Sequence, residues 1–129
     1  MTEVIRELEI RKVIENLLID VAPRLFYEKA AKDTPYPYAV YEISDSIDDG
    51  SLEDMELEVN GWDKPSNGSS IELATLMGNI DNKLHRSINN SNGVFFSIYR
   101  ENRRAIRDPD ESIRRRQMTY QIRLMGVGM

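Results

Sequence analysis

The last third of the chain contains two strand-like segments on either side of an acidic turn, and this pattern restricts the fold more than any other feature. Arg103–Arg107 leads into a turn at Asp108–Ser112, where Asp and Pro are typical turn residues. Gln117–Leu124 follows and alternates between polar and apolar side chains, as a strand with one buried face does. We therefore predict a β-hairpin whose apolar face must be covered by other elements.

The rest of the chain supplies elements that can cover this face. Apolar residues at helical spacing predict helices over residues 3–21 and after Ser69, where Ser69 and Glu72 match a capping box and Asp81 is expected to point outward. Further strands are predicted over residues 38–44, 55–62 and 94–99, and a turn over 89–93. This order predicts an α+β fold: one domain spanning residues 1–129, with a small antiparallel or mixed β-sheet and two α-helices packed on one face.

The charge balance points to assembly. Twelve arginines occur in a chain whose net charge is −5, so we expect contact surfaces of both signs. A pI near 4.9 argues against a general nucleic-acid binder, which is usually basic. No apolar segment has the form of a secretory signal or the length of a membrane span.

The residue types that bond-making chemistry requires are scarce. The chain has no cysteine and a single histidine, His85, which we expect on the surface at the end of the second helix. The sequence also lacks a Gly-rich phosphate loop and a Gly-x-Ser-x-Gly motif. We therefore predict no catalytic residue, no cofactor and no metal site.

Several short motifs occur in an order that is typical of one family. Pro35–Tyr38 leads into an alternating strand, a second strand ends at Val59–Trp62, an amphipathic helix follows, and Arg107–Asp110 turns into the closing arginine-rich strand. In this order the chain, from Val13 to Leu124, resembles the small tail-terminator and head–tail joining proteins of long-tailed bacteriophages and prophages.

The resemblance implies a structural role in the virion tail. Such proteins form a ring, commonly a hexamer, at the head-proximal end of the tail tube, and the ring terminates tube polymerisation. The implied partners are other copies of the chain, the tail-tube protein and a head-completion or connector protein, while DNA passes the lumen without specific binding. Assembly would take place in the cytoplasm of the bacterial host, without a membrane.

Two groups of residues are candidates for subunit or partner contacts. One group contains the arginines on both sides of the predicted turn, and the other contains Trp62 and Tyr36. Trp62 could instead belong to the core or its edge, and Tyr36 could instead pack on a helix of its own chain. The arginines could pair locally with the carboxylates of the turn, pair with acidic residues of a neighbouring subunit, or bind DNA. The candidate arginines are Arg103, Arg104, Arg107, Arg114, Arg115 and Arg116.

An acidic segment, 45–54, is the remaining candidate. Its spacing partly matches a calcium loop, but Ile47 occupies a position that needs an oxygen ligand, and the flanking segments are strands instead of helices. We therefore predict a solvated, mobile loop that does not hold calcium and that contacts the lumen or a partner. Its acidic residues are Asp45, Asp48, Asp49, Glu53 and Asp54.

Two other functions stay open at this stage. The chain could be a small cytosolic protein-binding regulatory module, since its charged surfaces would serve that role equally well. It could also be an enzyme that uses paired carboxylates, because such a pair cannot be recognised from sequence spacing. A closed ring would distinguish the virion role from the regulatory one.

Overall fold

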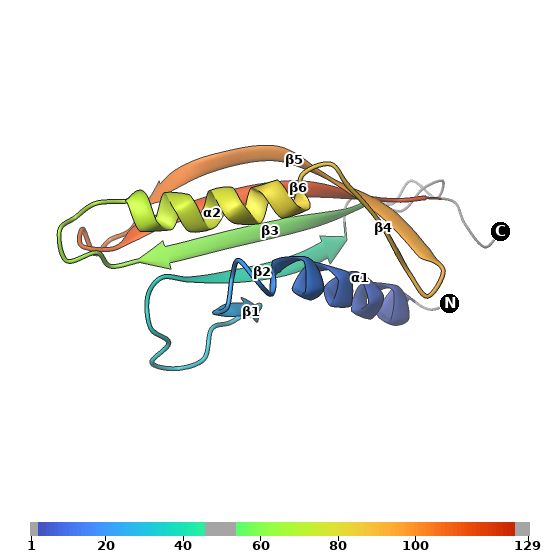
Figure 1. Ribbon diagram of the computed structural model, residues 1–129, viewed down its shortest axis with the longest axis horizontal. Coiled ribbons are helices and arrows are strands. Elements are labelled where there is room, and N and C mark those ends of the chain that lie inside the picture. The colour runs from blue at the N-terminus through green and yellow to red at the C-terminus, as the bar shows by residue number, and fades with distance from the viewer. Residues whose placement is uncertain (1–2, 46–53, 126–129) are drawn as a thin grey trace.

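The structure of the chain is a computed structural model that describes residues 3–45 and 54–125, and it has two helices on one face of a six-stranded sheet (Figure 1). Helix α1 spans Glu3–Leu18 and helix α2 spans Ile71–Leu84. The strands are β1 (Leu25–Tyr27), β2 (Tyr38–Asp45), β3 (Asp54–Asp63), β4 (Ser87–Ser91), β5 (Val94–Arg107) and β6 (Arg114–Leu124).

The sheet has the strand order β1-β2-β3-β6-β5-β4. β1 is parallel to β2, and the other neighbours are antiparallel, so the sheet is mixed. The predicted α+β class is confirmed. The predicted hairpin is confirmed as well, because β5 and β6 pair up to Arg107 opposite Arg114.

The strands differ from the sequence prediction in several details. Residues 94–99 and 103–107 belong to one strand, β5, because a bulge between Arg100 and Asn102 absorbs the residues that interrupt the alternation. The predicted turn at 89–93 is wrong in its first half, since β4 extends to Ser91 and only Asn92 and Gly93 turn, with φ of 48° and 82°. β1 was missed because three residues are too few to show a pattern.

The core lies between the helices and the covered face of the sheet. Both helices bury one stripe, and the partly buried Val13, Leu17, Val21 and Leu76 flank these stripes. At Gly61 the backbone of β3 approaches α2 closely, since a Cβ there would lie 2.6 Å from Met77 Sδ. The fully buried helix residues are Ile10, Ile14, Leu18, Leu73, Ile80 and Leu84, and their sheet partners include Leu57, Val59, Phe96, Ile98, Tyr120 and Ile122.

The predicted capping box of α2 is wrong. The N-cap is Ser70, which makes no side-chain capping bond, while Ser69 Oγ accepts a hydrogen bond from the Ile71 amide at 3.2 Å. The Ser70 hydroxyl is instead the acceptor of Arg116 Nη2 at 3.3 Å. The start of α2 is therefore attached to strand β6 by a long-range contact, which a local sequence motif cannot reveal.

Glu9 joins the first helix to the β4–β5 turn. Its carboxylate is buried and accepts hydrogen bonds from Ser91 Oγ at 2.5 Å, Asn92 Nδ2 at 3.0 Å and Lys12 Nζ at 3.0 Å. These bonds favour the charged form, the Ser91 bond most strongly, and they lower the pKa of Glu9 to about 2. The hydrogen bonds from Ser91 and Asn92 thus fix the position of α1 against the far edge of the sheet.

Core truncation should destabilise the protein in proportion to burial. We expect Ile14→Ala and Leu73→Ala each to lower the free energy of unfolding by about 2–5 kcal/mol, because both side chains are fully buried. Ile71→Ala is the control, since that side chain is 73% exposed and should change stability by less than about 0.5 kcal/mol. Urea denaturation followed by circular dichroism measures all three, and equal losses would contradict the packing described.

The Glu9 contact should make stability depend on pH. Since folding lowers the pKa of Glu9 from 4.5 to about 2, its stabilising effect is complete above the higher value and is lost as pH falls to the lower one. We expect Glu9→Gln to lower the melting temperature at pH 7 and to approach wild-type stability near pH 2. Glu101→Gln, at an exposed position, is the control. A pH-independent difference between wild type and Glu9→Gln would contradict this account.

Candidate interaction site

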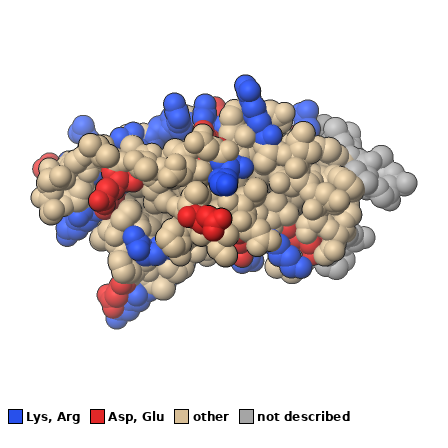
Figure 2. Space-filling model, viewed as in Figure 1, with Lys and Arg blue, Asp and Glu red and all other residues tan. Residues whose placement is uncertain are grey.

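The β5–β6 hairpin brings the six candidate arginines to one end of the sheet. Across the pair, Arg104 lies opposite Gln117, Ile106 opposite Arg115 and Arg107 opposite Arg114. Figure 2 shows Lys and Arg side chains along the upper edge of the molecule, where β5 runs in Figure 1. The sequence prediction that these arginines gather across the turn is correct in geometry.

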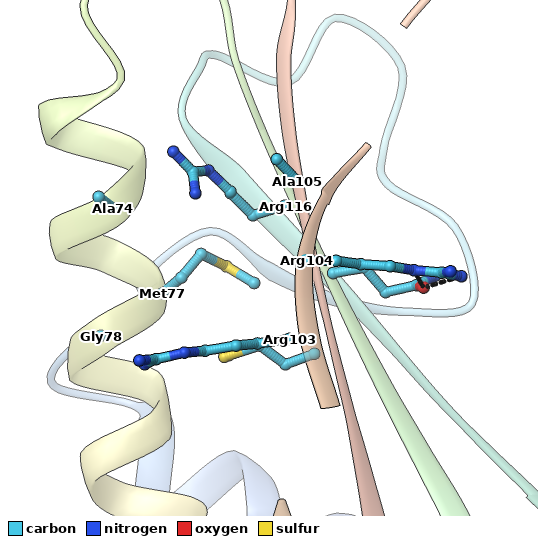
Figure 3. A pocket seen from close by; sticks show the side chains of 9 residues that line it. Ala74, Met77, Gly78, Arg103, Arg104, Ala105 and Arg116 are labelled. Atoms are coloured by element: carbon cyan, nitrogen blue, oxygen red, sulfur yellow. Dashed lines mark hydrogen bonds between the residues drawn. The ribbon is translucent and has the colours of Figure 1, made fainter. Parts of the chain in front are cut away.

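The arginines form the wall of a groove beside α2. A pocket of about 430 Å³ lies between this helix and the hairpin, and Arg103 and Arg116 extend from the strands towards the helix (Figure 3). A second pocket of about 680 Å³ continues towards the turn and shares Ala105 and Arg116 with the first. We call the two pockets together the arginine groove; Ala74, Met77 and Gly78 of α2 line one side of it.

Four of the six arginines have local partners. Arg104 points to the helix-free face and donates to Gln117 Oε1 at 3.0 and 2.9 Å (Figure 3). Arg114 donates to the carbonyl oxygens of Gly68 and Glu111, at 3.2 and 2.8 Å. The other two bonds run from Arg115 to Asn60 Oδ1 at 3.1 Å and from Arg116 to Ser70 Oγ.

Arg103 and Arg107 differ from the other four. Both are exposed, and neither donates a hydrogen bond or forms an ion pair within the described residues. The carboxylates of the turn do not neutralise them, because those carboxylates shape the turn itself. Asp110 accepts two hydrogen bonds from Ser112, which lower the pKa of Asp110, so the local pairing considered from sequence is not seen in the described part of the chain.

Tyr36 and Trp62 belong to one row of stacked groups at the same end of the sheet. The rings of Tyr36 and Tyr38 have centroids 5.4 Å apart, and Tyr38 stacks on Trp62 at 5.3 Å. The Arg115 guanidinium lies 5.1 Å from the centre of the Trp62 ring. Trp62 is half-buried and Tyr36 is 39% exposed, so the row ends in an accessible aromatic ring.

The helix-free face also carries a polar network that the sequence did not indicate. Gln117 donates to Glu58 and to Asn60 Oδ1, and Asn60 donates to Glu58 at 3.0 Å. Gln117 and Asn60 are both only 8% exposed. Polar residues alternating on a strand were expected to face water, but here they bond to one another across β3, β6 and β5.

A second missed group lies in the core under α2. Asp81, which the helical pattern placed outward, is buried and accepts a hydrogen bond from the Tyr120 hydroxyl at 2.7 Å. Burial and this bond raise the pKa of Tyr120, and Arg100 forms an ion pair with Asp81. His85 is half-buried and its Nδ1 accepts the Arg100 amide at 2.9 Å, so these groups connect α2 to the bulge in β5.

The acidic candidates occupy different elements. Asp45 ends β2 and Asp54 begins β3, so the predicted loop is too long by one residue at each end. Asp54 accepts a hydrogen bond from Gln121 at 3.0 Å and lies 3.8 Å from Arg123. Asp48, Asp49 and Glu53 lie outside the described residues, and so does the prediction of a mobile loop. Within the described ranges no group of three or more His, Cys, Asp or Glu side chains is placed to hold a metal ion.

Comparison with known proteins gives a structural match. No protein-family model and no curated protein matches the chain. Among solved structures, the fold is similar to a chain from the "Virion of native gene transfer agent (GTA) particle", with a TM-score of 0.61 and 13% sequence identity. The match covers 94% of this chain and 92% of that chain. Neither helix of the described part is long and apolar enough to cross a membrane.

The buried Tyr120–Asp81 bond should contribute to stability. We expect Tyr120→Phe to lower the free energy of unfolding by about 1–3 kcal/mol, because it leaves a buried carboxylate oxygen without its hydroxyl partner. Tyr99→Phe is the matched control at a site that is 48% exposed, and it should be near neutral. Thermal denaturation measures both, and equal stability of the two variants would contradict a role for this bond.

Proposed function

We propose that the chain is a structural protein of a phage-like virion, and specifically a tail-terminator subunit that joins tail to head. The observation that carries this proposal is the similarity of fold over nearly the whole length of both chains to a protein of a virion particle. The order of motifs from Val13 to Leu124 supports the same assignment independently, because it resembles the tail-terminator family.

The architecture suits a protein that acts by contact. Both helices cover one face of the sheet, so the other face and the arginine groove remain available to neighbours. In this proposal copies of the chain form a ring, commonly a hexamer, at the head-proximal end of the tail tube. The ring occupies the growing end of the tube, stops addition of tail-tube protein and presents a surface to the head connector.

The charge of the chain fits a channel that DNA crosses. A net charge of −5 gives no general attraction for phosphates, so DNA would pass the lumen without specific binding. No chemistry is needed for this role, since each function of the ring depends on shape and surface contacts. The proposed location is the virion tail, with assembly in the cytoplasm of the bacterial host.

Deletion of the coding gene in the producing strain tests the proposed function. We expect tails of uncontrolled length that are not attached to heads, visible by negative-stain electron microscopy, and rescue by the wild-type gene in trans. Heads and tail-tube protein should be made in normal amounts, which controls for a general loss of expression. Normal, joined particles in the deletion strain would contradict the proposal.

Ring formation has its own measurement. We expect native mass spectrometry to detect a closed oligomer of the 14.9 kDa subunit, with the hexamer as the main species, when the protein is purified alone or with tail tubes. On isolated tails, gold-labelled antibody should mark one end only. Labelling along the tube, or at neither end, would contradict a terminator role.

A further inference from the structure

The charges of the chain are separated across the sheet. The β2–β3 hairpin has six acidic residues and no basic one in its two strands. The β5–β6 hairpin, Val94–Leu124, contains eight arginines and four acidic residues. Because β3 pairs with β6, the two hairpins lie side by side and give the sheet an acidic half and a basic half.

The basic half ends in an open strand edge. β4 pairs with β5 only from Val94 to Ile98, so on that side no described strand accompanies residues 101–107. Arg103 and Arg107 stand on this open stretch, exposed and without a partner in the described chain. Charged side chains on such an edge oppose pairing with another strand, so Arg103 and Arg107 favour a contact made through their charges. We call Arg103, Arg107 and this edge the basic strip.

The acidic half carries a complementary group. Glu42 of β2 and Glu56 of β3 lie on the helix-free face, are exposed, and make no hydrogen bond or ion pair with the described residues. Glu42 lies directly opposite Glu58, and Glu56 lies two residues before Glu58 on the same face of β3, so the three carboxylates are neighbours. Such neighbours repel one another unless cations from outside compensate them. We call Glu42 and Glu56 the acidic strip.

We propose that neighbouring copies associate head to tail, with the basic strip of one copy docked on the acidic strip of the next. This inference rests on the proposed ring, and it identifies the surfaces that form the ring. The occupant of the basic strip is a second copy of this chain, because the chain itself carries the exposed carboxylates that match the exposed arginines. A contact between two different strips is heterologous, and a heterologous contact closes into a ring when the rotation between copies permits it.

Charge reversal tests the proposal. The basic-strip variant is Arg103→Glu with Arg107→Glu, and the acidic-strip variant is Glu42→Lys with Glu56→Lys. Each variant alone should lose the oligomer in analytical ultracentrifugation, because its two strips then carry like charge. An equimolar mixture should regain the oligomer, with the two variants alternating, since every contact again joins opposite charges. Lys83→Glu with Glu72→Lys, on the exposed surface of α2, is the control and should assemble like wild type.

Cysteine cross-linking extends the test to weak association. The chain has no cysteine, so Ala105→Cys and Ser44→Cys introduced together provide the only thiols and keep all four charged residues of the two strips. Oxidation of concentrated protein should give a ladder of multimers, whereas either single variant should stop at dimers. The ladder should disappear in about 1 M salt, where screening reduces the Debye length to roughly 3 Å.

The two proposals fail separately. Self-assembly of each charge-reversed variant, a mixture that stays monomeric while wild type assembles, or absence of the ladder would overturn the head-to-tail contact. Docking of the basic strip on tail-tube protein instead of on a second copy would overturn it as well. None of these results bears on the deletion phenotype, and normal tails in the deletion strain would reject the terminator function while leaving the contact intact.

Discussion

The pairing of β6 with β3 and β5 is the interaction on which the rest of the structure depends. β6 lies between the two long strands, so its register fixes which side chains enter the core and which reach the helix-free face. Tyr120 and Ile122 are buried under the helices, while Gln117 joins the polar network on the opposite side. A shift by one residue would exchange these two sets and place a glutamine in the core.

The same register divides the arginines into structural and available groups. Arg115 stacks on Trp62 and bonds to Asn60, and Arg116 holds the start of α2 through Ser70. These guanidinium groups donate hydrogen bonds within the chain, so replacing them would also disturb the fold. Arg103 and Arg107 have no such partner among the described residues, so their guanidinium groups are not needed for the contacts within the fold.

Two chains can share this fold at 13% identity. A sheet with helices on one face needs a pattern of apolar residues on each element, and many sequences satisfy that pattern. The identity of surface residues is then free to follow the partners. In this chain charge is separated between the neighbouring β2–β3 and β5–β6 strand pairs, which gives the sheet an acidic half and a basic half.

The sequence by itself determined the class of the fold, because apolar periodicity indicates both helices and strands β2, β3 and β6, and the turn residues at 108–112 indicate the hairpin that joins β5 to β6. It also placed the arginines together, since an antiparallel hairpin brings both sides of its turn into register. Only the tertiary structure decided the short edge strands β1 and β4, the inward position of Asp81 and the partners of each arginine. These features depend on residues distant in the chain. The buried Asp81 accepts a hydrogen bond from Tyr120, and Ser70 accepts one from Arg116. Local patterns carry no information about such contacts. Arginines that are indistinguishable in the sequence therefore have different partners in the structure.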